Sequence, residues 1–563
     1  ISSSIPLSPS QAGFRPARSC GDQIYLLAEA ARDALQRERE EKDRRVNYHR
    51  SVAFIDFSKA FDRVDHTSFL YKLHKKGVGP RVWRFFDAFL SGRSFQVISG
   101  GYRSDLFPIS AGVPQGSISG PLAFCVLIDD LPEEMERVHC TCQLFADDVA
   151  ARGRNLGSAG DDQLQKGLDV LYRWTLKWKL VINLDKSVFI VFSSRRYTPN
   201  LFVGGRPLTA VEYVRYLGVW FTKTLSWHHH AQRVLAKAKA ASHLLCRIAA
   251  GVRSVRVVRA LVLAIVRARI IYGFPFWRPS PTDLTNLQRC MLKPLRKALG
   301  LPDSAQSESV LAELGIPTLQ RTWQHYLLSW AAKSIDCGYR SDYLKGQLPA
   351  VSKFHSCLSR CFGGEPDQDA LPYQALTLWQ SEWQPLVRPE KRLIRPDESP
   401  ELSRKRSTAL QCIRPRQLKR IALLLSYRDW RTSRQGALQS WRRDDEPGLA
   451  LYLQHDERAT FVLRARLRFA RSYLRHHQHR LGLSADAVCQ ECDTGRNETI
   501  DHVVLECPKY SEARRQLQEA LALLGVRLSP SLVLGQLTTR ELRVAKRVLE
   551  ATGTFLRTVH ELR

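Results

Sequence analysis

Acidic residues are scarce in this 563-residue chain: 55 Asp and Glu stand against 85 Lys and Arg, for a formal net charge of +30. A balance this basic predicts a polyanionic partner, because Lys and Arg neutralise the phosphates of nucleic acids. The alternative is a basic, highly soluble protein that binds no nucleic acid. Hydrophobic residues make up 44% of the chain, so the composition does not indicate disorder. The length suggests about two to four domains.

Long apolar runs are also missing. The longest, Ala260–Ile271, is interrupted by Arg267 and Arg269, so it cannot span a bilayer. No charged leader followed by an apolar run and a cleavage site is visible. We therefore expect neither secretion nor a membrane partner. The first residue is Ile1 rather than Met, which we interpret as the sign of a fragment of a longer product.

Cysteine is sparse, with 13 residues in all, and without a secretory leader we expect no disulfide framework. Four possible metal ligands are nevertheless grouped: Cys489, Cys492, His502 and Cys507, separated by two, nine and four residues. Three thiolates and one imidazole suit tetrahedral Zn²⁺, and the short step between the first two cysteines fits its geometry. We predict one Zn²⁺ here, with chance spacing as the alternative. The looser histidine clusters are interpreted as surface residues: His228, His229, His230, His476, His477 and His479.

Residues 11–225 alternate apolar β-type runs with amphipathic stretches, an α+β pattern. The expected strands are Ser51–Phe57, Cys142–Phe145 and Val188–Phe192, and the expected helices are Cys20–Arg39 and Pro80–Leu90. Residues 226–335 are almost wholly helical in pattern. The expected helices there are Ala231–Arg247 and Arg256–Ile271.

Residues 336–480 combine many prolines with strong positive charge. The stretch 388–480 holds 23 Lys and Arg against 10 Asp and Glu. We expect a helix over Arg458–Arg480, with five arginines on it: Arg464, Arg466, Arg468, Arg471 and Arg475. We predict that this helix contacts nucleic acid, and a solvated basic face is the alternative.

Three aspartates follow strand-like runs. An apolar run ends at Asp56, and Asp147 and Asp148 lie between apolar flanks that predict a tight hairpin with the acids at its tip. In nucleotidyl transfer, two divalent ions about 3.5–4 Å apart clamp the attacking and leaving oxygens. Carboxylates are the ligands that Mg²⁺ prefers, and without metal they repel one another. For each acid taken singly, a turn cap or a surface hairpin is the alternative.

Six segments occur in order along residues 11–230: Gln11–Pro16, Phe54–His66, Ala111–Leu122, Phe145–Asp148, Leu184–Ser187, and Tyr216–Val219 followed by Leu225–Trp227. They read QAGFRP, FIDFSKAFDRVDH, AGVPQGSISGPL, FADD, LDKS, and YLGV with LSW. In this order they resemble the reverse transcriptases of non-LTR, LINE-type retrotransposons. The cysteine and histidine group resembles the C-terminal zinc knuckle of the same proteins.

The resemblance implies a set of site residues: Asp56, Asp147 and Asp148 for two Mg²⁺ ions, Phe61 against the sugar, Gln115 and Gly116 at the nascent base pair, Lys186 at the leaving pyrophosphate, and Arg15 at template or triphosphate. Phe61 would exclude a 2′-hydroxyl. The alternative for Phe61 is a plain core residue. The alternative for Lys186 is a solvated lysine in a turn.

The implied architecture is a right-hand polymerase of the α+β class, with a palm built on an antiparallel sheet. Its expected parts are N-terminally truncated fingers and palm in 1–225, a helical thumb in 226–335, a basic connector with the Arg-rich helix in 336–480, a zinc knuckle in 481–515, and a helical tail in 516–563. The implied partners are an RNA template, a DNA primer or target, and dNTPs. The implied location is nuclear and cytoplasmic, as a ribonucleoprotein. The oligomeric state stays open.

Three alternatives compete with RNA-directed DNA synthesis. An RNA-templated RNA polymerase usually has a second Asp where this chain has Phe61, and Gly where it has Ala146. A zinc-finger DNA-binding protein leaves residues 50–225 unexplained. A truncated or decayed element product that binds RNA or DNA without polymerising stays open, because the family's upstream fingers segment is not in this chain.

Overall fold

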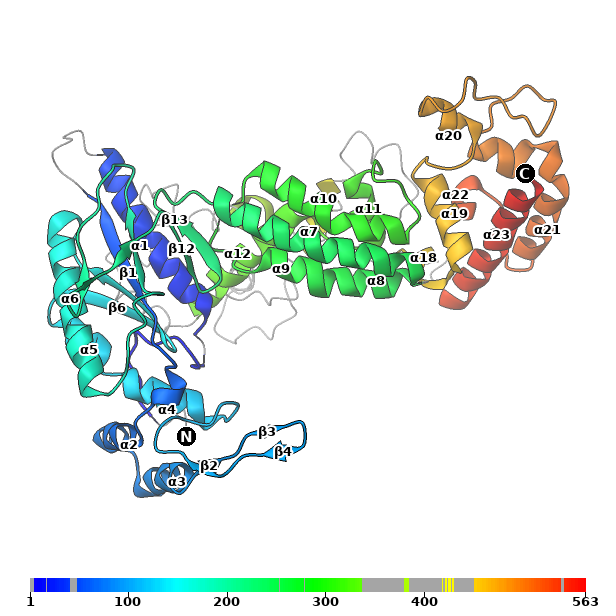
Figure 1. Cartoon of the computed structure of the whole chain (residues 1–563). Coiled ribbons are helices and arrows are strands. Elements are labelled where there is room, and N and C mark those ends of the chain that lie inside the picture. Colours follow the sequence, from blue (N-terminus) through cyan, green and yellow to red (C-terminus); the bar gives the residue numbers. More distant parts are fainter. Residues whose placement is uncertain are drawn as a thin grey trace, which may run out of the picture. The chain divides into compact units, whose positions relative to one another are not determined.

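A computed structural model describes residues 5–16, 18–40, 48–252, 254–277, 279–336, 379–383, 418, 421–422, 424–426, 428–429, 450–537 and 541–563. The chain divides into two units. The first is Ile1–His230 with short later segments, and the second begins at Ala231 and holds most of the remainder. Figure 1 draws both, coloured along the sequence. None of the described helices has the length and apolar character needed to cross a membrane.

The first unit is built on a five-stranded sheet of order β11-β8-β1-β7-β6. Its strands are β1 (Arg50–Ile55), β6 (Cys140–Phe145), β7 (Asp148–Gly153), β8 (Val188–Phe192) and β11 (Thr209–Ala210). Neighbouring strands run antiparallel, except that β11 is parallel to β8. All three strands expected from the sequence are confirmed, with small shifts at their ends.

Helices cover both faces of this sheet. Successive strand residues point to opposite faces, so a strand that is buried along its whole length needs packing partners on each side. Ala53 and Ile55 of β1 share a hydrophobic core with Leu164 and Leu168 of α6 (Gly157–Lys177). The residues of β1 that alternate with them are buried as well. The helix α1 (Cys20–Glu40) contacts β1, β6 and β8 and lies across the strands in Figure 1.

Smaller elements surround the sheet. The helices are α2 (His66–Lys75), α3 (Pro80–Leu90), α4 (Ser119–Ile128), α5 (Leu131–Glu136) and a one-turn 3-10 helix, Phe61–Arg63. The short strands are β2 (Ser94–Phe95), β3 (Ile98–Ser99), β4 (Tyr102–Arg103), β5 (Phe107–Pro108), β9 (Phe202–Val203), β10 (Arg206–Pro207), β12 (Tyr213–Tyr216) and β13 (Val219–Thr222). The start of α2 is capped by Asp65, whose side chain accepts the Ser68 N–H at 2.9 Å. Pro80 opens α3, where a missing N–H costs nothing.

The second unit is helical where it is described. Its earlier helices are α7 (His228–Gly251), α8 (Val255–Leu261), α9 (Ala268–Ile271), α10 (Pro281–Ala298), α11 (Ser307–Leu314) and α12 (Leu319–Asp336). A π-helical stretch, Val262–Arg267, joins α8 to α9, and another covers Trp379–Trp383. Its later helices are α18 (Tyr452–His455), α19 (Arg458–Arg468), α20 (Arg475–Arg480), α21 (Ser511–Ala522), α22 (Pro530–Val533) and α23 (Leu542–Leu562), with short turns at His502–Glu506 and Pro508–Tyr510.

Packing between α7 and α10 supplies a hydrogen bond that a proline removes from α10. Pro294 lies inside α10 and has no N–H to offer the carbonyl of Cys290, four residues earlier. The buried Ser242 of α7 donates its hydroxyl to that carbonyl at 2.8 Å. A proline that local rules would place outside a helix is therefore accommodated by a neighbouring helix.

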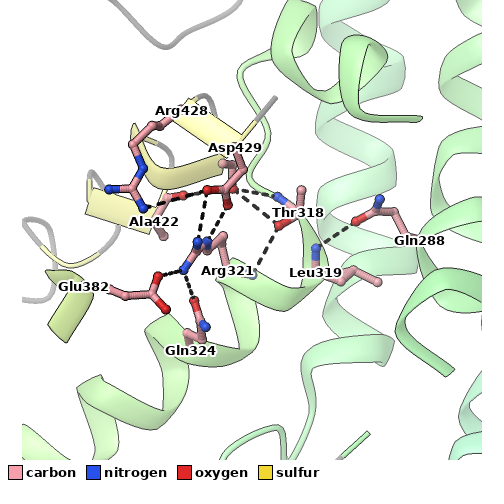
Figure 2. A network of polar contacts seen from close by, with 10 residues as sticks. Gln288, Thr318, Leu319, Arg321, Gln324, Glu382, Ala422, Arg428 and Asp429 are labelled. Carbon is pink, nitrogen blue, oxygen red and sulfur yellow. Dashed lines mark hydrogen bonds and ion pairs between the residues drawn. The ribbon is translucent and has the colours of Figure 1, made fainter. Parts of the chain in front are cut away.

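A buried arginine joins α12 to two segments that follow it in the chain. Figure 2 shows Arg321 between Asp429 and Glu382, with Gln324 one turn along the same helix. The guanidinium donates to both Asp429 oxygens, at 2.8 and 3.1 Å, and to Gln324 Oε1 at 2.8 Å. It also pairs with Glu382. Forked, charge-assisted bonding of this kind is strong and directional, so it holds these segments in place.

The expected single helix over Arg458–Arg480 is wrong, because two helices, α19 and α20, occupy that stretch. The chain leaves the helix after Arg468, and Ala470 adopts a left-handed φ of +50°. Most of the expected basic connector in 336–480 lies outside the described residues.

Candidate active site and zinc cluster

The hairpin of β6 and β7 carries two of the predicted acids. Its strands pair Leu144 with Val149 and Phe145 with Asp148, so Ala146 and Asp147 form the turn. Ala146 has a φ of +57°, a left-handed conformation that costs a residue with a Cβ energy. The expected tight hairpin with acids at its tip is confirmed.

Asp56 lies beside this hairpin. The antiparallel pairing of β1 with β7 puts Ile55 opposite Val149, so the next residue, Asp56, is level with Asp148. Partial burial and then the charges of Asp147 and Asp56 raise the pKa of Asp148 to about 6. Partial burial also raises the pKa of Asp147, with Asp56 adding to the rise. The three ionised carboxylates therefore repel one another, and a bound cation would offset this repulsion.

The backbone of Asp56 is held by a turn that contains Lys186. The Asp56 N–H donates to Ser187 Oγ at 3.1 Å, and the Asp56 carbonyl accepts the Asn183 N–H at 2.8 Å. Lys186 is exposed in this turn. Lys186 thus lies in the turn that is hydrogen-bonded to the backbone of Asp56, and this position fits both a leaving-group role and a solvated lysine.

Phe61, Gln115 and Gly116 lie on segments that touch. Phe61 is half-buried, and its ring centroid is 5.1 Å from that of Phe124 in α4. Gln115 is exposed and donates its side-chain amide to Asp62 Oδ1 at 3.0 Å. Gly116 has a φ of +85° with open space where a Cβ would stand. The left-handed backbone, rather than a close neighbour, therefore explains why this position is a glycine.

The Arg15 side chain forms hydrogen bonds within its own segment. Its guanidinium donates to the carbonyl of Ser8 and, at 3.2 Å, to that of Gln11. These bonds shape the loop that precedes α1. The buried side chain of Gln11 also bonds to the hairpin turn, a contact that the sequence motif did not reveal.

The four expected zinc ligands come together in the second unit. One ligand atom from each of Cys489, Cys492, His502 and Cys507 lies within 4.8 Å of all the others. Among the described residues this is the one group of at least three Cys, His, Asp or Glu side chains that meets this condition, and the three aspartates do not form such a group. His502 Nε2 lies 3.3 Å from Cys492 Sγ. The donor set and its convergence fit tetrahedral Zn²⁺.

Two neighbouring side chains shape this cluster. A hydrogen bond with the Thr494 hydroxyl, 3.0 Å away, is the main reason that the pKa of Cys492 falls to about 6. Such a shift favours the thiolate that binds metal. Thr499 Oγ1 accepts the backbone N–H of His502 at 3.1 Å, which fixes the start of the turn that carries this ligand.

Glu498, which lies between Cys492 and His502 in the sequence, is fully buried. It forms an ion pair with Arg563, and its Oε2 accepts the backbone N–H of Arg475 at 2.8 Å. The Arg563 guanidinium also lies 4.8 Å from the centre of the Tyr473 ring. The Cys3His segment is thus tied to the last residue of the sequence, a role for Glu498 that spacing alone did not indicate.

The Cys3His group shares its hydrophobic core with the helices that follow it in the sequence. Cys489 and Cys507 pack in one hydrophobic cluster with Leu517 of α21, Leu532 of α22 and Phe555 of α23. A metal bound to this segment would therefore be coupled to the packing of the helices that follow it.

Two of the histidines interpreted as surface residues are buried, so that interpretation is wrong for them. His230 is 2% exposed and accepts the Trp220 N–H at 3.3 Å. His477 is 8% exposed, and its Nδ1 lies 2.7 Å from the Ser472 hydroxyl. Burial lowers the pKa of His477 to about 4, so it is neutral near pH 7.

Two of the arginines of α19 are not on a basic surface. Arg464 and Arg468 are buried, and their guanidinium groups pair with Asp456 and Glu313. Arg466 is exposed, and it donates to the carbonyl of Gly300 at 3.0 Å. The helix therefore supplies internal ion pairs, because a charge that leaves water needs a partner.

Comparison with known proteins identifies the first unit. Residues 3–221 match the reverse transcriptase (RNA-dependent DNA polymerase) family. The RNA-directed DNA polymerase from mobile element jockey of Drosophila melanogaster is 27% identical over 324 residues, 55% of this chain and 34% of that protein. The probable RNA-directed DNA polymerase from transposon X-element of the same species is 30% identical over 242 residues, 41% of this chain and 25% of that protein.

The matched region spans 34% or less of these relatives' length. A solved telomerase from Candida albicans aligns with 62% of this chain and 55% of its own at 10% identity and a TM-score of 0.30, which bears on neither fold nor function. The family match covers the first five of the six segments and Tyr216–Val219 of the sixth. Residues 3–221 therefore form a reverse transcriptase domain of the kind carried by the RNA-directed DNA polymerases of non-LTR retrotransposons.

Proposed function

We propose that this chain extends a DNA primer on an RNA template by two-metal nucleotidyl transfer. One observation carries the proposal: the β6–β7 hairpin presents Asp147 and Asp148 level with Asp56 inside a domain that matches reverse transcriptases. In this proposal the three carboxylates hold two Mg²⁺ ions. When bound, these ions would stabilise the charge on the attacking and leaving oxygens.

Other side chains would select and orient the substrates. Phe61 would stand against the sugar of the incoming dNTP and exclude a 2′-hydroxyl. Gln115 and Gly116 would line the nascent base pair, since both are exposed. Lys186 would offset the charge of the leaving pyrophosphate. Arg15, which donates to the carbonyls of Ser8 and Gln11, would act mainly by shaping the segment that faces template or triphosphate.

For the nucleic acid itself, the helices α7 and α10 support a contact surface better than α19 does. The sequence of α7 contains no Asp or Glu. Lys239 on α7 and Lys293 and Lys297 on α10 are exposed, and all three lie near enough to Cys246 or Cys290 to influence those thiols electrostatically. We call these three residues the lysine patch. Lysines grouped in this way would bind the phosphates of the RNA template or the DNA primer.

The Cys3His group would hold one Zn²⁺, which would order residues 487–510. As part of a retrotransposon ribonucleoprotein the chain would work in the nucleus and the cytoplasm.

Primer extension on an RNA template with Mg²⁺ and dNTPs tests the polymerase proposal. Asp147→Asn and Asp148→Asn should each lower the extension rate about 1,000-fold or more, since the carboxylates would position charge at the reacting phosphate. RNA affinity should stay within about twofold, because it depends on distributed Lys and Arg. Asp162→Asn, at an exposed position on α6, is the matched control.

Near-wild-type extension by the Asp147 or Asp148 variant would reject the assignment. RNA binding by the wild-type chain without any extension would favour the second candidate, an element product that binds nucleic acid without polymerising.

A further inference from the structure

Gln11 reaches the hairpin turn that carries the acids. Its side chain is fully buried, and Oε1 accepts the N–H groups of Ala146 at 2.9 Å and Gly13 at 2.8 Å. Nε2 lies 3.3 Å from the carbonyl oxygen of Ala146, to which it donates. One amide side chain therefore pairs with both the N–H and the carbonyl of the residue just before Asp147.

The two bonded peptide groups flank the strained residue of the turn. Ala146 has a φ of +57°, which an alanine adopts only when its surroundings enforce it. The carbonyl that Gln11 holds belongs to the same peptide group as the N–H of Asp147. Fixing this peptide group fixes the direction in which the Asp147 side chain leaves the turn.

The backbone around Gln11 is seated on the edge of the sheet. Leu144 N–H donates to the Ser10 carbonyl at 3.0 Å, and Ala12 N–H donates to the Leu144 carbonyl at 2.9 Å. A Cβ at Gly13 would lie 2.3 Å from the Ala146 nitrogen. The segment 10–13 thus approaches the turn so closely that Gly13 cannot gain a side chain without moving it.

Resting on the proposed polymerase function, we infer that Gln11 is a positioning residue: its amide holds the Ala146–Asp147 turn in the left-handed geometry that aligns Asp147 and Asp148 with Asp56. It contacts no reacting atom itself. Its effect passes through the metal-binding carboxylates, for which small displacements are costly in rate.

The test compares two buried glutamines. Gln11→Met keeps the length of the side chain and removes its hydrogen bonds. Gln23→Met is the matched control, because Gln23 is equally buried and bonds to the carbonyls of Ser10 and Leu144 on the same sheet edge, short of the turn. Gly13→Ala disturbs the same contact from a second direction, because its Cβ would lie 2.3 Å from the Ala146 nitrogen and 3.0 Å from Gln11 Oε1.

For Gln11→Met and Gly13→Ala, kcat for primer extension should fall about 10- to 100-fold. The Mg²⁺ concentration for half-maximal rate should rise, while KM for dNTP stays within about twofold. The Ala146 amide should lose protection from hydrogen exchange in Gln11→Met. Gln23→Met should lower the melting temperature about as much as Gln11→Met and leave kcat near wild type. Equal kinetic losses in Gln11→Met and Gln23→Met would overturn the inference, as would unchanged kinetics in Gln11→Met.

If the wild-type chain does not extend primers, the polymerase proposal fails and the inference is judged on metal binding alone. A Mn²⁺ titration followed by electron paramagnetic resonance then compares the variants, with Asp147→Asn as the blank. Gln11→Met should bind Mn²⁺ more weakly than Gln23→Met. Equal affinity would reject a positioning role.

Discussion

At the scale of single residues, Phe61 combines two environments that the sequence presented as alternatives. It packs against the core through Phe124, yet it is only half-buried. Part of its ring is therefore free to meet a substrate. In the proposed function, the same residue would support the core and limit the sugar that fits beside the acids.

Phe61→Val is expected to relax sugar selection. Removing ring bulk leaves room for a ribose 2′-hydroxyl, so kcat/KM for rNTP should rise relative to dNTP by about tenfold or more, equivalent to about 1.4 kcal/mol. The truncation should also cost about 1–2 kcal/mol of stability, less than for a fully buried ring. Steady-state kinetics with both nucleotides and a melting curve measure the two effects.

Phe69→Leu provides the comparison, since Phe69 is fully buried and packs edge-on against Phe86. It should lower stability and leave the ratio of the two substrates unchanged. A Phe61→Val enzyme that behaves in the same way would assign Phe61 to the core alone.

At the scale of elements, α19 is fastened by the ion pair of Arg468 with Glu313 of α11. Arg468 Nε donates to Glu313 Oε1 at 2.9 Å, and Nη1 donates to the carbonyl of Leu534 at 2.7 Å. Arg468→Met should destabilise α19 by about 3–5 kcal/mol, because it leaves a buried carboxylate without its partner. Hydrogen exchange of the α19 amides in increasing urea measures this loss.

Arg466→Met, two residues away on the exposed side of the same helix, should change the stability by less than about 0.5 kcal/mol. The double variant Arg468→Met/Glu313→Met should recover most of the stability, since it buries no lone charge. A double variant as unstable as Arg468→Met would show that the lost contact, rather than the isolated carboxylate, determines the cost.

The Cys3His element should bind one zinc ion per chain. Element analysis of the purified protein should find about one equivalent, and Cys489→Ser/Cys507→Ser should lose it. Removal of the metal with a chelator should expose the amides of residues 487–510 to exchange. It should also weaken α21 and α23, which share the hydrophobic core with Cys489 and Cys507.

Cys246→Ser/Cys290→Ser is the control, because both cysteines lie in the α7–α10 region away from this group. Absence of zinc from the wild-type protein, or full zinc in Cys489→Ser/Cys507→Ser, would contradict the prediction.

At the scale of the whole molecule, the net charge of +30 should appear as a steep salt dependence of RNA affinity. Each phosphate contact contributes about −0.7 to the slope of log affinity against log salt for single strands. Replacing the lysine patch, Lys239, Lys293 and Lys297, by Gln should therefore flatten the slope by about 2. Fluorescence titrations at several salt concentrations measure it.

A triple variant of equal charge, Lys166→Gln/Lys509→Gln/Lys546→Gln, removes exposed lysines from other elements and should change the slope far less. Equal flattening by both triple variants would mean that binding follows net charge rather than the lysine patch.

The sequence determined much of this molecule because its signals are local. Two strand-like flanks around Asp147 and Asp148 predict a hairpin from neighbouring residues alone. The helix Pro80–Leu90 was predicted with the bounds that the structure has, since a proline start and an apolar stripe lie within its own residues. The four residues of the Cys3His group could be identified because they fall within 19 consecutive residues.

Tertiary structure decided whatever depends on a partner that is distant in the sequence. Arg468 of α19 looked like part of a basic surface because its acidic partner is not local: Glu313 is 155 residues away. Gln11 became part of the site only when residues 135 positions away were folded against it. A sequence shows which side chains could carry charge or donate hydrogen bonds. Only the fold chooses their partners, since burial makes an unpaired charge or amide costly and so selects the arrangement in which each is paired.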